Sequence, residues 1–511
     1  MMRITNSMMT SNTKNNINLN KLNEDKVNTQ MATGQKISRP SDDPVIAIRA
    51  LRLNTNLSQL NQYYEKNIPD ANAWLKVTET ALSQTNAVFT SIKENLTTGA
   101  SDTNTADDRL KLLTSLQGYR KEIYSAGNAD YAGRTVFTGY RTGEPLTFLT
   151  TDTDLKASYE IHQNLKGDDV ESFTYITTAD RSKDSGEILE KNVTSNDIYR
   201  LRLPYDTLAS TGDIDIDGTA VTPTTQSITG LTQAQIDDIY TSYVDDTSTT
   251  PAATFIPETG EIIMNKAMKD ALADADKVTI DYTKDKWQSG DLRPEHYFAC
   301  KKTDEGKTDP VYYNYEQDPV TKQPIPDKPN FVDQEIQVEI SFNQKITINT
   351  HADKVYNHDL GRDIDDLLAA TQDVVDLDAK IAKYKEQLSK ATDTSTPTKD
   401  EVQTELDGLN KEYALKKDKM QKMFSSALDR FEGYADRNNE VIADIGSLSS
   451  RLKITKERVA DQLQSFKELA DDNINISITD TAIDLSNAEL ALQAAQMAAG
   501  KIAQQTLLNY L

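Results

Sequence analysis

A long repeat of apolar residues near the carboxyl end constrains the fold of this chain more than any other feature. Between Phe431 and Val459 the repeat advances by alternating steps of three and four residues, and after one additional step of four it continues through Leu463 to Ala470. Only Asn438 and Thr455 in this series are polar. Such a series predicts an α-helix that packs along its length on another helix, as in a coiled coil. One helix over residues 404–472 would be about 100 Å long. Because a helix of that length is unstable alone in water, we expect it to pair with other helices of the chain.

Composition divides the chain into three regions. Residues 1–140 show helical periodicity with few prolines, residues 145–355 hold eleven of the fifteen prolines, and residues 360–511 return to helical periodicity. Alternation of apolar and polar residues predicts strands in the middle region. These strands are expected at Ser172–Ile176, Val278–Tyr282, Val311–Tyr315, Ile336–Phe342 and Ile346–Ile348. We therefore expect a mainly α fold with a β-rich insertion, in which both ends of the chain pair in a long helical bundle.

Local signals set the expected ends of the first helices. A first helix over Thr5–Ala32 should stop at Gly34, which can supply a left-handed cap. Asp43 is a good N-cap for the next helix, with Pro44 at its first position. Pro69 predicts a break or kink.

The segment Asp480–Leu511 is apolar or small on nearly every side. After Asp484, its only charged side chains are Glu489 and Lys501. A helix of this kind is buried either in a large protein or among copies of itself. No other segment of the chain is apolar enough to enclose it, so we expect partner molecules to cover part of it. Residues spaced seven apart form three series, namely Leu485, Leu492 and Ala499; Ala488, Ala495 and Ile502; and Ile483, Leu490 and Met497.

Composition also excludes several classes of protein. The single cysteine, Cys300, excludes a disulfide framework and any zinc site that needs two thiolates from this chain. The formal net charge of −24 disfavours binding to nucleic acid or to anionic membranes. No apolar stretch is long enough to span a membrane, and no cleavable secretory signal is recognisable. We therefore expect neither a nucleic-acid nor a membrane partner.

Candidate catalytic and metal sites are weak. Asp213–Gly218 resembles the start of a calcium loop, but Thr224 stands where that loop needs Glu, so a strand ending at a glycine turn is the preferred interpretation. The four histidines lack metal-ligand spacing, and no nucleophile motif is present. We predict no catalytic residue, no metal site and no cofactor. The pair Asp365 and Asp366 is interpreted as part of a solvated helix face.

Several short motifs resemble a known family. These are Met2–Thr5, Met31–Lys36, Arg39–Pro44 with the sequence Arg-Pro-Ser-Asp-Asp-Pro, Gly133–Tyr140, and the ending from Ser486 to Leu511. Over about residues 2–145 and 425–511 the chain resembles the flagellar hook-associated protein 3 family, the hook–filament junction proteins, and its last helix is similar to that of flagellins.

The resemblance implies a structural subunit of the bacterial flagellum that is not an enzyme. It implies export by the flagellar type III apparatus without a cleavable signal, and an extracellular location at the hook–filament junction. The implied partners are further copies in a ring, the first hook-associated protein, flagellin and a flagellar export chaperone.

The resemblance and the composition together predict three domains. Residues 1–40 with 475–511 would form a terminal helical polymer core, residues 41–145 with 360–474 a helical bundle with an extra helical arm at 376–420, and residues 146–359 the outward β-rich part. The predicted subunit-interface residues are Arg39, Pro40, Ser41, Asp42, Asp43 and Pro44 in the loop, and Leu485, Ala488, Leu492, Ala495, Ala499 and Ile502 in the terminal helix.

Two alternatives stay open. The first is a flagellin, the subunit of the filament itself. The second is an enzyme or glycan-binding module carried on the polymer by residues 150–355, which the size and the aromatic residues of that region suggest. Those aromatic residues are Trp287, Tyr297, Tyr312, Tyr313 and Tyr315.

Overall fold

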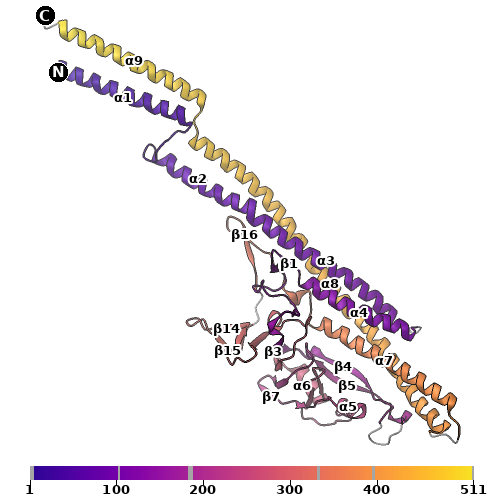
Figure 1. Ribbon diagram of the computed structural model, residues 1–511. Helices are drawn as coiled ribbons and strands as arrows, with labels where there is room; N and C mark the ends of the chain where they lie inside the picture. The colour runs from indigo at the N-terminus through magenta and orange to yellow at the C-terminus, as the bar shows by residue number, and fades with distance from the viewer. Residues whose placement is uncertain (1–4, 102–103, 182–187, 331–333, 394–396, 509–511) are drawn as a thin grey trace. The chain divides into compact units, whose positions relative to one another are not determined.

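The computed structural model describes residues 5–101, 104–181, 188–330, 334–393 and 397–508 (Figure 1). The chain divides into two compact units. Unit 1 comprises Met1–Asn72, Val338–Ile346 and Ser449–Leu511, and unit 2 comprises Ala73–Gln337 and Thr347–Leu448. The helices are α1 (Asn6–Thr33), α2 (Pro44–Gln62), α3 (Ile68–Gly99), α4 (Ala106–Gly127), α5 (Gln233–Tyr240), α6 (Lys266–Asp274), α7 (Asp359–Lys390), α8 (Lys399–Ile474) and α9 (Ile478–Leu508).

The long coiled-coil helix is confirmed. α8 is one helix of 76 residues, and the residues of its repeat are buried at Phe431, Ile445, Leu452 and Val459. Leu377 and Ile381 of α7 share a buried apolar cluster with Leu406 and Leu409 of α8. The helical arm expected at 376–420 stays a prediction, and residues 394–396 within it lie outside the described part. Helix α1 starts at the Thr5 cap and ends at Gly34, whose φ of 70° is left-handed as expected.

The expected break at Pro69 is wrong, because α3 continues through this residue, whereas the kink stays a prediction. A single π-helical turn, Tyr63–Asn67, joins α2 to α3 without a loop. Pro69 has no N–H, and its ring would clash with a carbonyl one turn earlier in a regular helix. The wider π turn lies over those preceding residues, and the amide of Ile68 donates to the carbonyl of Tyr63 five residues back. The chain therefore absorbs the proline within a continuous helix.

Within unit 2, α3 packs on α8 through an aromatic core. The ring of Phe89 lies 6.4 Å from that of Phe431 and 6.5 Å from that of Tyr434. Asn438, the polar residue of the repeat, is fully buried and donates from Nδ2 to the carbonyl of Leu82 at 2.8 Å. A buried amide with one specific partner fixes the register of two helices that apolar contacts alone leave free to slide.

Two sheets dominate the β-rich part of unit 2. One has the strand order β13-β12-β3-β11-β6-β7 and the other β4-β5-β10-β9-β8, in which only β8 and β9 are parallel. The first sheet contains β3 (Ser158–Leu165), β6 (Ser210–Ile216), β7 (Thr219–Val221), β11 (Val278–Lys284), β12 (Ala299–Thr303) and β13 (Val311–Tyr313). The second contains β4 (Val170–Ile176), β5 (Ser195–Arg202), β8 (Thr224–Thr225), β9 (Ala253–Ile256) and β10 (Glu261–Met264).

The described residues also form three two-stranded hairpins, namely β1 (Asp130–Tyr131) with β2 (Arg134–Thr135), β14 (Tyr315–Gln317) with β15 (Pro324–Pro329), and β16 (Gln337–Ser341) with β17 (Gln344–Thr347). The strand interpretation of Asp213–Gly218 is confirmed, because β6 turns into β7 through Gly218 with φ of 83°. The fold class is also confirmed: the terminal helices pack together, and a β-rich region with several sheets lies between them in sequence.

After α4, the motif Gly133–Tyr140 forms a turn and places one aromatic side chain in the core. Gly133 has φ of 76° in the turn between β1 and β2, and Phe137 is fully buried against the ring of Tyr356 at 5.1 Å. Gly139 also has positive φ, and a Cβ there would approach the side chain of Gln334 to 2.7 Å. The motif therefore needs both glycines for backbone reasons.

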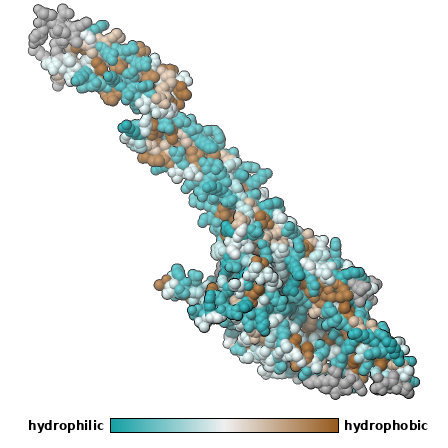
Figure 2. Space-filling model, in the orientation of Figure 1, coloured by the Kyte–Doolittle hydropathy of each residue, from teal (hydrophilic) through white to brown (hydrophobic). Residues whose placement is uncertain are grey.

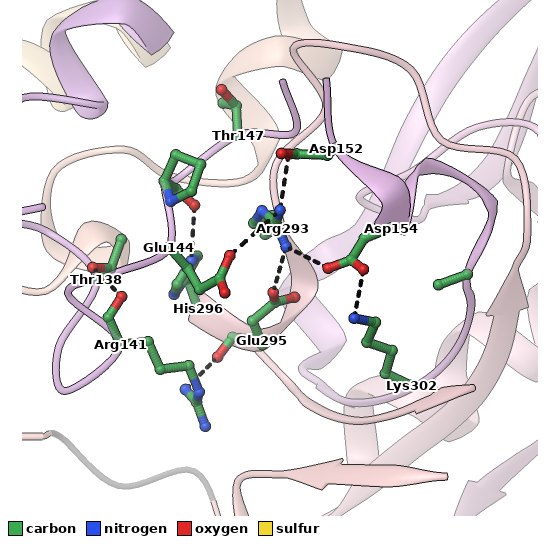
Figure 3. A network of polar contacts seen from close by, with 12 residues as sticks. Thr138, Arg141, Glu144, Thr147, Asp152, Asp154, Arg293, Glu295, His296 and Lys302 are labelled. Atoms are coloured by element: carbon green, nitrogen blue, oxygen red, sulfur yellow. Dashed lines mark hydrogen bonds and ion pairs between the residues drawn. The ribbon is translucent and has the colours of Figure 1, made fainter. Parts of the chain in front are cut away.

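A buried arginine ties the segment after this motif to the β-rich part. Figure 3 shows the guanidinium of Arg293 among the carboxylates of Asp152, Asp154 and Glu295. Its Nη2 donates to Asp152 at 2.8 Å, and its Nη1 lies 3.2 Å from both Asp154 and Glu295. Because Arg293 is only 3% exposed, these charge-assisted bonds compensate its desolvation.

A second buried network corrects the interpretation of Asp365 and Asp366 as solvated. Asp366 on α7 accepts from Arg200 and Arg202 of β5, each at 2.8 Å. Asp365 pairs with Arg120 of α4. Burial raises the pKa of Asp366, but the two arginines pull it further down, to about 2. This acidic pair therefore fastens α7 to a sheet and to α4.

Candidate assembly surface

The predicted loop Arg39–Pro44 lies in unit 1 between α1 and α2. The Asp42 carboxylate accepts from the amides of Ser38 at 3.1 Å and Arg39 at 2.8 Å, which closes the loop on itself. The Asp43 carboxylate accepts from the amides of Val45 and Ile46, so it caps α2 as expected. Asp43 is half-buried and the other five residues of the loop are exposed.

Backbone hydrogen bonds join this loop to the link between α8 and α9. Gln35 and Asn475 form an antiparallel bridge, in which the amide of Lys36 donates to the carbonyl of Ile474 at 2.7 Å and the amide of Ile476 donates to Gly34 at 3.0 Å. The Lys36 ammonium donates to the carbonyl of Asp472. These bonds hold together the two places where the chain enters and leaves the terminal helix pair. Sequence reasoning missed this bridge, because no side-chain pattern marks it.

The helices α1 and α9 lie side by side along the ends of the chain (Figure 1). Val27 of α1 is buried, and Nδ2 of Asn20 donates to the carbonyl of Ala491 at 3.2 Å. The six interface residues predicted in α9 lie on its buried side. Of these, Ala488 and Leu492 are buried, and Leu485, Ala495, Ala499 and Ile502 are half-buried. The chain itself therefore uses this face for α1, and its contact with another subunit stays a prediction.

The opposite face of α9 is apolar and uncovered within the described chain. Ile483, Leu490 and Met497 are exposed by 56%, 61% and 66%. They follow one another at intervals of seven residues, so they form one stripe along the helix. At about 100° per residue this stripe lies roughly opposite the side of Leu492. The series that sequence reasoning left out of the interface is thus the one that the subunit leaves open.

Other helices of unit 1 also expose apolar side chains. Leu19 and Leu22 on α1 are exposed by 62% and 66%, and three apolar residues at the start of α2, Val45, Ile48 and Leu51, are exposed by at least 53%. Figure 2 shows apolar residues among hydrophilic ones along the terminal helices. Most of the large apolar side chains that the described residues expose belong to unit 1, although unit 2 holds most of the chain. A concentration of this kind is typical of surfaces that bind other molecules.

The alternative of an enzyme or glycan-binding module was suggested by five aromatic residues, of which Tyr312, Tyr313 and Tyr315 are half-buried. Trp287 and Tyr297, two of the five aromatic residues behind that alternative, are buried by 94% and 92% and pack in the core. Across the five described ranges, no group of three or more His, Cys, Asp or Glu residues is placed to hold a metal ion. None of the described helices combines the length and the apolar character needed to cross a membrane.

Comparison with known proteins places the amino-terminal region. Residues 4–142 match the family described as the bacterial flagellin N-terminal helical region. The chain is 32% identical over 142 residues to flagellar hook-associated protein 3 of Salmonella typhimurium, covering 28% of this chain and 44% of that protein. It is 34% identical over 120 residues to flagellar hook-associated protein 3 of Escherichia coli, covering 23% of this chain and 37% of the relative. The chain thus spans less than half the length of these relatives.

A solved structure aligns with more of the chain, but its sequence identity and structural similarity are low. Flagellar hook associated protein-3 of Legionella pneumophila covers 82% of this chain and 97% of its own, with 9% identity and a TM-score of 0.29. A TM-score this low does not establish a common fold. The sequence match over residues 4–142 is the stronger finding: these residues match the bacterial flagellin N-terminal helical region, and the resemblance to flagellar hook-associated protein 3 is confirmed over this part of the chain.

Proposed function

We propose that this chain is a structural subunit of the bacterial flagellum at the hook–filament junction, and that it acts by assembly rather than by catalysis. The observation that carries the proposal is the apolar stripe of Ile483, Leu490 and Met497, on a helix already paired with α1. Covering such a stripe with neighbouring subunits removes apolar surface from water and therefore stabilises the assembly. The match of residues 4–142 to flagellin-type proteins supports the flagellum as the assembly.

The proposed partners follow from this role. Further copies of the chain pack through α1, α9 and the loop Arg39–Pro44, and form a ring. The first hook-associated protein lies on one side of the ring and flagellin on the other. An export chaperone covers α9 before secretion, and the mature subunit lies outside the cell. In this proposal the terminal helices face the inside of the tube, and the β-rich part faces outward.

A flagellin subunit is the nearest alternative, because flagellins carry the same amino-terminal helical region. Deleting the gene separates the two roles. For a junction subunit, cells lack filaments, but flagellin is still made and accumulates in the medium. For a filament subunit, the medium lacks this product and the remaining flagellins stay on the cell. Flagellin that stays attached in normal amounts in the deletion strain would contradict the junction role.

Complementation then tests the surface itself. A plasmid copy with Leu490→Asp should fail to restore filaments, since the substitution places a carboxylate in the stripe. A copy with Val320→Asp is the matched control. Val320 is an apolar residue of unit 2 that is 86% exposed in the loop between β14 and β15, and that copy should restore filaments.

A further inference from the structure

The outer face of α2 in unit 1 combines apolar and basic side chains. Val45, Ile48 and Leu51 are exposed by at least 53%, and Arg49 and Arg52 are exposed beside them. At about 100° per residue, all of these except Leu51 fall within roughly 100° of the helix circumference, and Leu51 lies about 60° further round. α2 contains no Asp or Glu, so no side chain of the helix itself balances the two arginines.

Neither arginine has a counter-charge elsewhere in the part of the chain that the structure describes. Arg49 lines a groove between α2 and α8 together with Asp472, but these two side chains are not within ion-pair distance. No carboxylate of a described residue lies within ion-pair distance of Arg52 either. The face therefore offers apolar surface and two unpaired positive charges, which a partner with apolar and acidic side chains would complement.

The start of α9 carries that complementary pattern. Asp480, Asp484 and Glu489 are exposed and flank the apolar stripe of α9. At about 100° per residue, the two aspartates lie along one edge of the stripe and Glu489 lies along the other. Residues 468–500 contain six acidic residues and no Lys or Arg. Within the described ranges, none of the three carboxylates that flank the stripe forms an ion pair.

We propose that the outer face of α2 binds the start of α9 of a second copy of this chain. The apolar residues of α2 cover the first turns of the α9 stripe, around Ile483, and so remove apolar surface of both copies from water. Arg49 and Arg52 of one copy pair with Asp480 and Asp484 of the other. The pairing rests on the proposed assembly role, and it specifies which surface of one subunit meets which surface of the next.

Two features favour a second copy over a different protein as the partner. Both halves of the contact are present on one chain, and in the described subunit neither half neutralises the other. The two surfaces also differ, so the contact is heterologous: each subunit uses α2 toward one neighbour and α9 toward another. Heterologous contacts repeat from subunit to subunit and generate a ring when the rotation between subunits closes. Opposite charges around an apolar centre also fix the orientation of the two copies.

Charge reversal tests the pairing in cells that lack the native gene. One variant, Arg49→Glu with Arg52→Glu, makes the α2 face acidic, and another, Asp480→Lys with Asp484→Lys, makes the start of α9 basic. Each variant alone brings like charges together, so the number of flagella labelled by antibody to the chain should fall about tenfold or more. The control is Lys66→Glu, which reverses an exposed cation about 20 Å further along the same continuous helix and should leave labelling normal.

Rescue separates this pairing from a loss of folding and from a different partner. A chain with all four substitutions restores opposite charges at each contact between copies, so it should restore labelling to near the native level. Co-expression of the two reversed variants should also restore labelling, because the variants can alternate along the ring. All four side chains are exposed, so circular dichroism of each purified variant should match that of the native chain.

The outcomes distinguish this pairing from the proposed function. Normal labelling of either reversed variant, or a chain with all four substitutions that stays defective, would overturn the pairing. A defect that persists in that chain would mean that the arginines or the aspartates face another flagellar protein. Filaments that stay attached in the deletion strain would instead overturn the proposed function, and the pairing with it.

Discussion

Replacing Leu490 on the outer face of α9 should weaken assembly while the subunit stays folded. Leu490 is 61% exposed, so most of its side chain is free to be covered by a neighbour. Full burial of a leucine side chain contributes about 1.5–3 kcal/mol, so covering the remaining surface contributes about 1–2 kcal/mol per subunit. Leu490→Ala keeps part of that surface and should weaken each contact by about 1 kcal/mol, or roughly fivefold. Leu490→Asp adds the burial of an unpaired carboxylate, which costs several kcal/mol more.

Leu492 provides the comparison within the same helix. It is 8% exposed and faces α1, so Leu492→Asp places the charge inside the subunit itself. We expect Leu492→Asp to separate α1 from α9 in the isolated chain, and Leu490→Asp to change the unfolding free energy of the isolated chain by less than about 0.5 kcal/mol. Both substitutions should block assembly, but only Leu492→Asp should lower the stability of the isolated chain.

The assay counts junctions that carry the variant. Cells that lack the native gene express each variant, and antibody to the chain is counted on flagella in the electron microscope. Circular dichroism of the purified chain measures the helix content and the unfolding of the monomer. Normal labelling with Leu490→Asp would refute the assignment of this face to neighbours, and loss of labelling with Val320→Asp would show that the assay responds to any charge.

Three further predictions concern the stability of the fold. Gly34→Ala should lower the stability of the α1 end by about 1 kcal/mol in calorimetry, because φ at Gly34 is +70°, whereas Gly118→Ala inside α4, where a Cβ meets nothing within 4 Å, should be neutral or stabilising. The low pKa of Asp366 stabilises the fold above its unfolded pKa of about 4, and about 2 kcal/mol should be lost as the pH falls from about 4 to about 2 in denaturant titrations. Arg200→Met leaves Glu171, Glu261 and Asp366 short of a partner, so it should cost about 3–5 kcal/mol in guanidinium unfolding and flatten that acid dependence.

The helical part of the fold was predictable because its signals are local and repeated. The series from Phe431 to Ala470 specifies a buried face over many turns, and Gly34 and Asp43 carry the backbone chemistry of helix ends. The π turn before Pro69 was not predictable from the sequence. A kink would also relieve the clash between the Pro69 ring and the carbonyl one turn earlier, and the sequence does not say which of the two occurs. Strand order depends on pairings between distant segments, such as β3 with β11 and β12, which no short pattern encodes.

The candidate surface was predictable only in part. The terminal helix is apolar on so many sides that its sequence does not say which side α1 covers. The structure places Leu492 against α1 and leaves Leu490 open, two residues away. Asp366 was misread because a carboxylate pair on a helix is usually solvated, and its arginine partners lie more than 160 residues earlier in the chain.

Chemical protection of α9 in the assembled flagellum tests the central claim most directly. The native Cys300 is fully buried, so a cysteine introduced at Leu490→Cys can be probed with a maleimide, with Val320→Cys as the control on an exposed loop. In the purified chain both cysteines should react rapidly. On isolated flagella the cysteine at position 490 should be protected by at least tenfold while the control still reacts. Equal reactivity at position 490 before and after assembly would contradict the account.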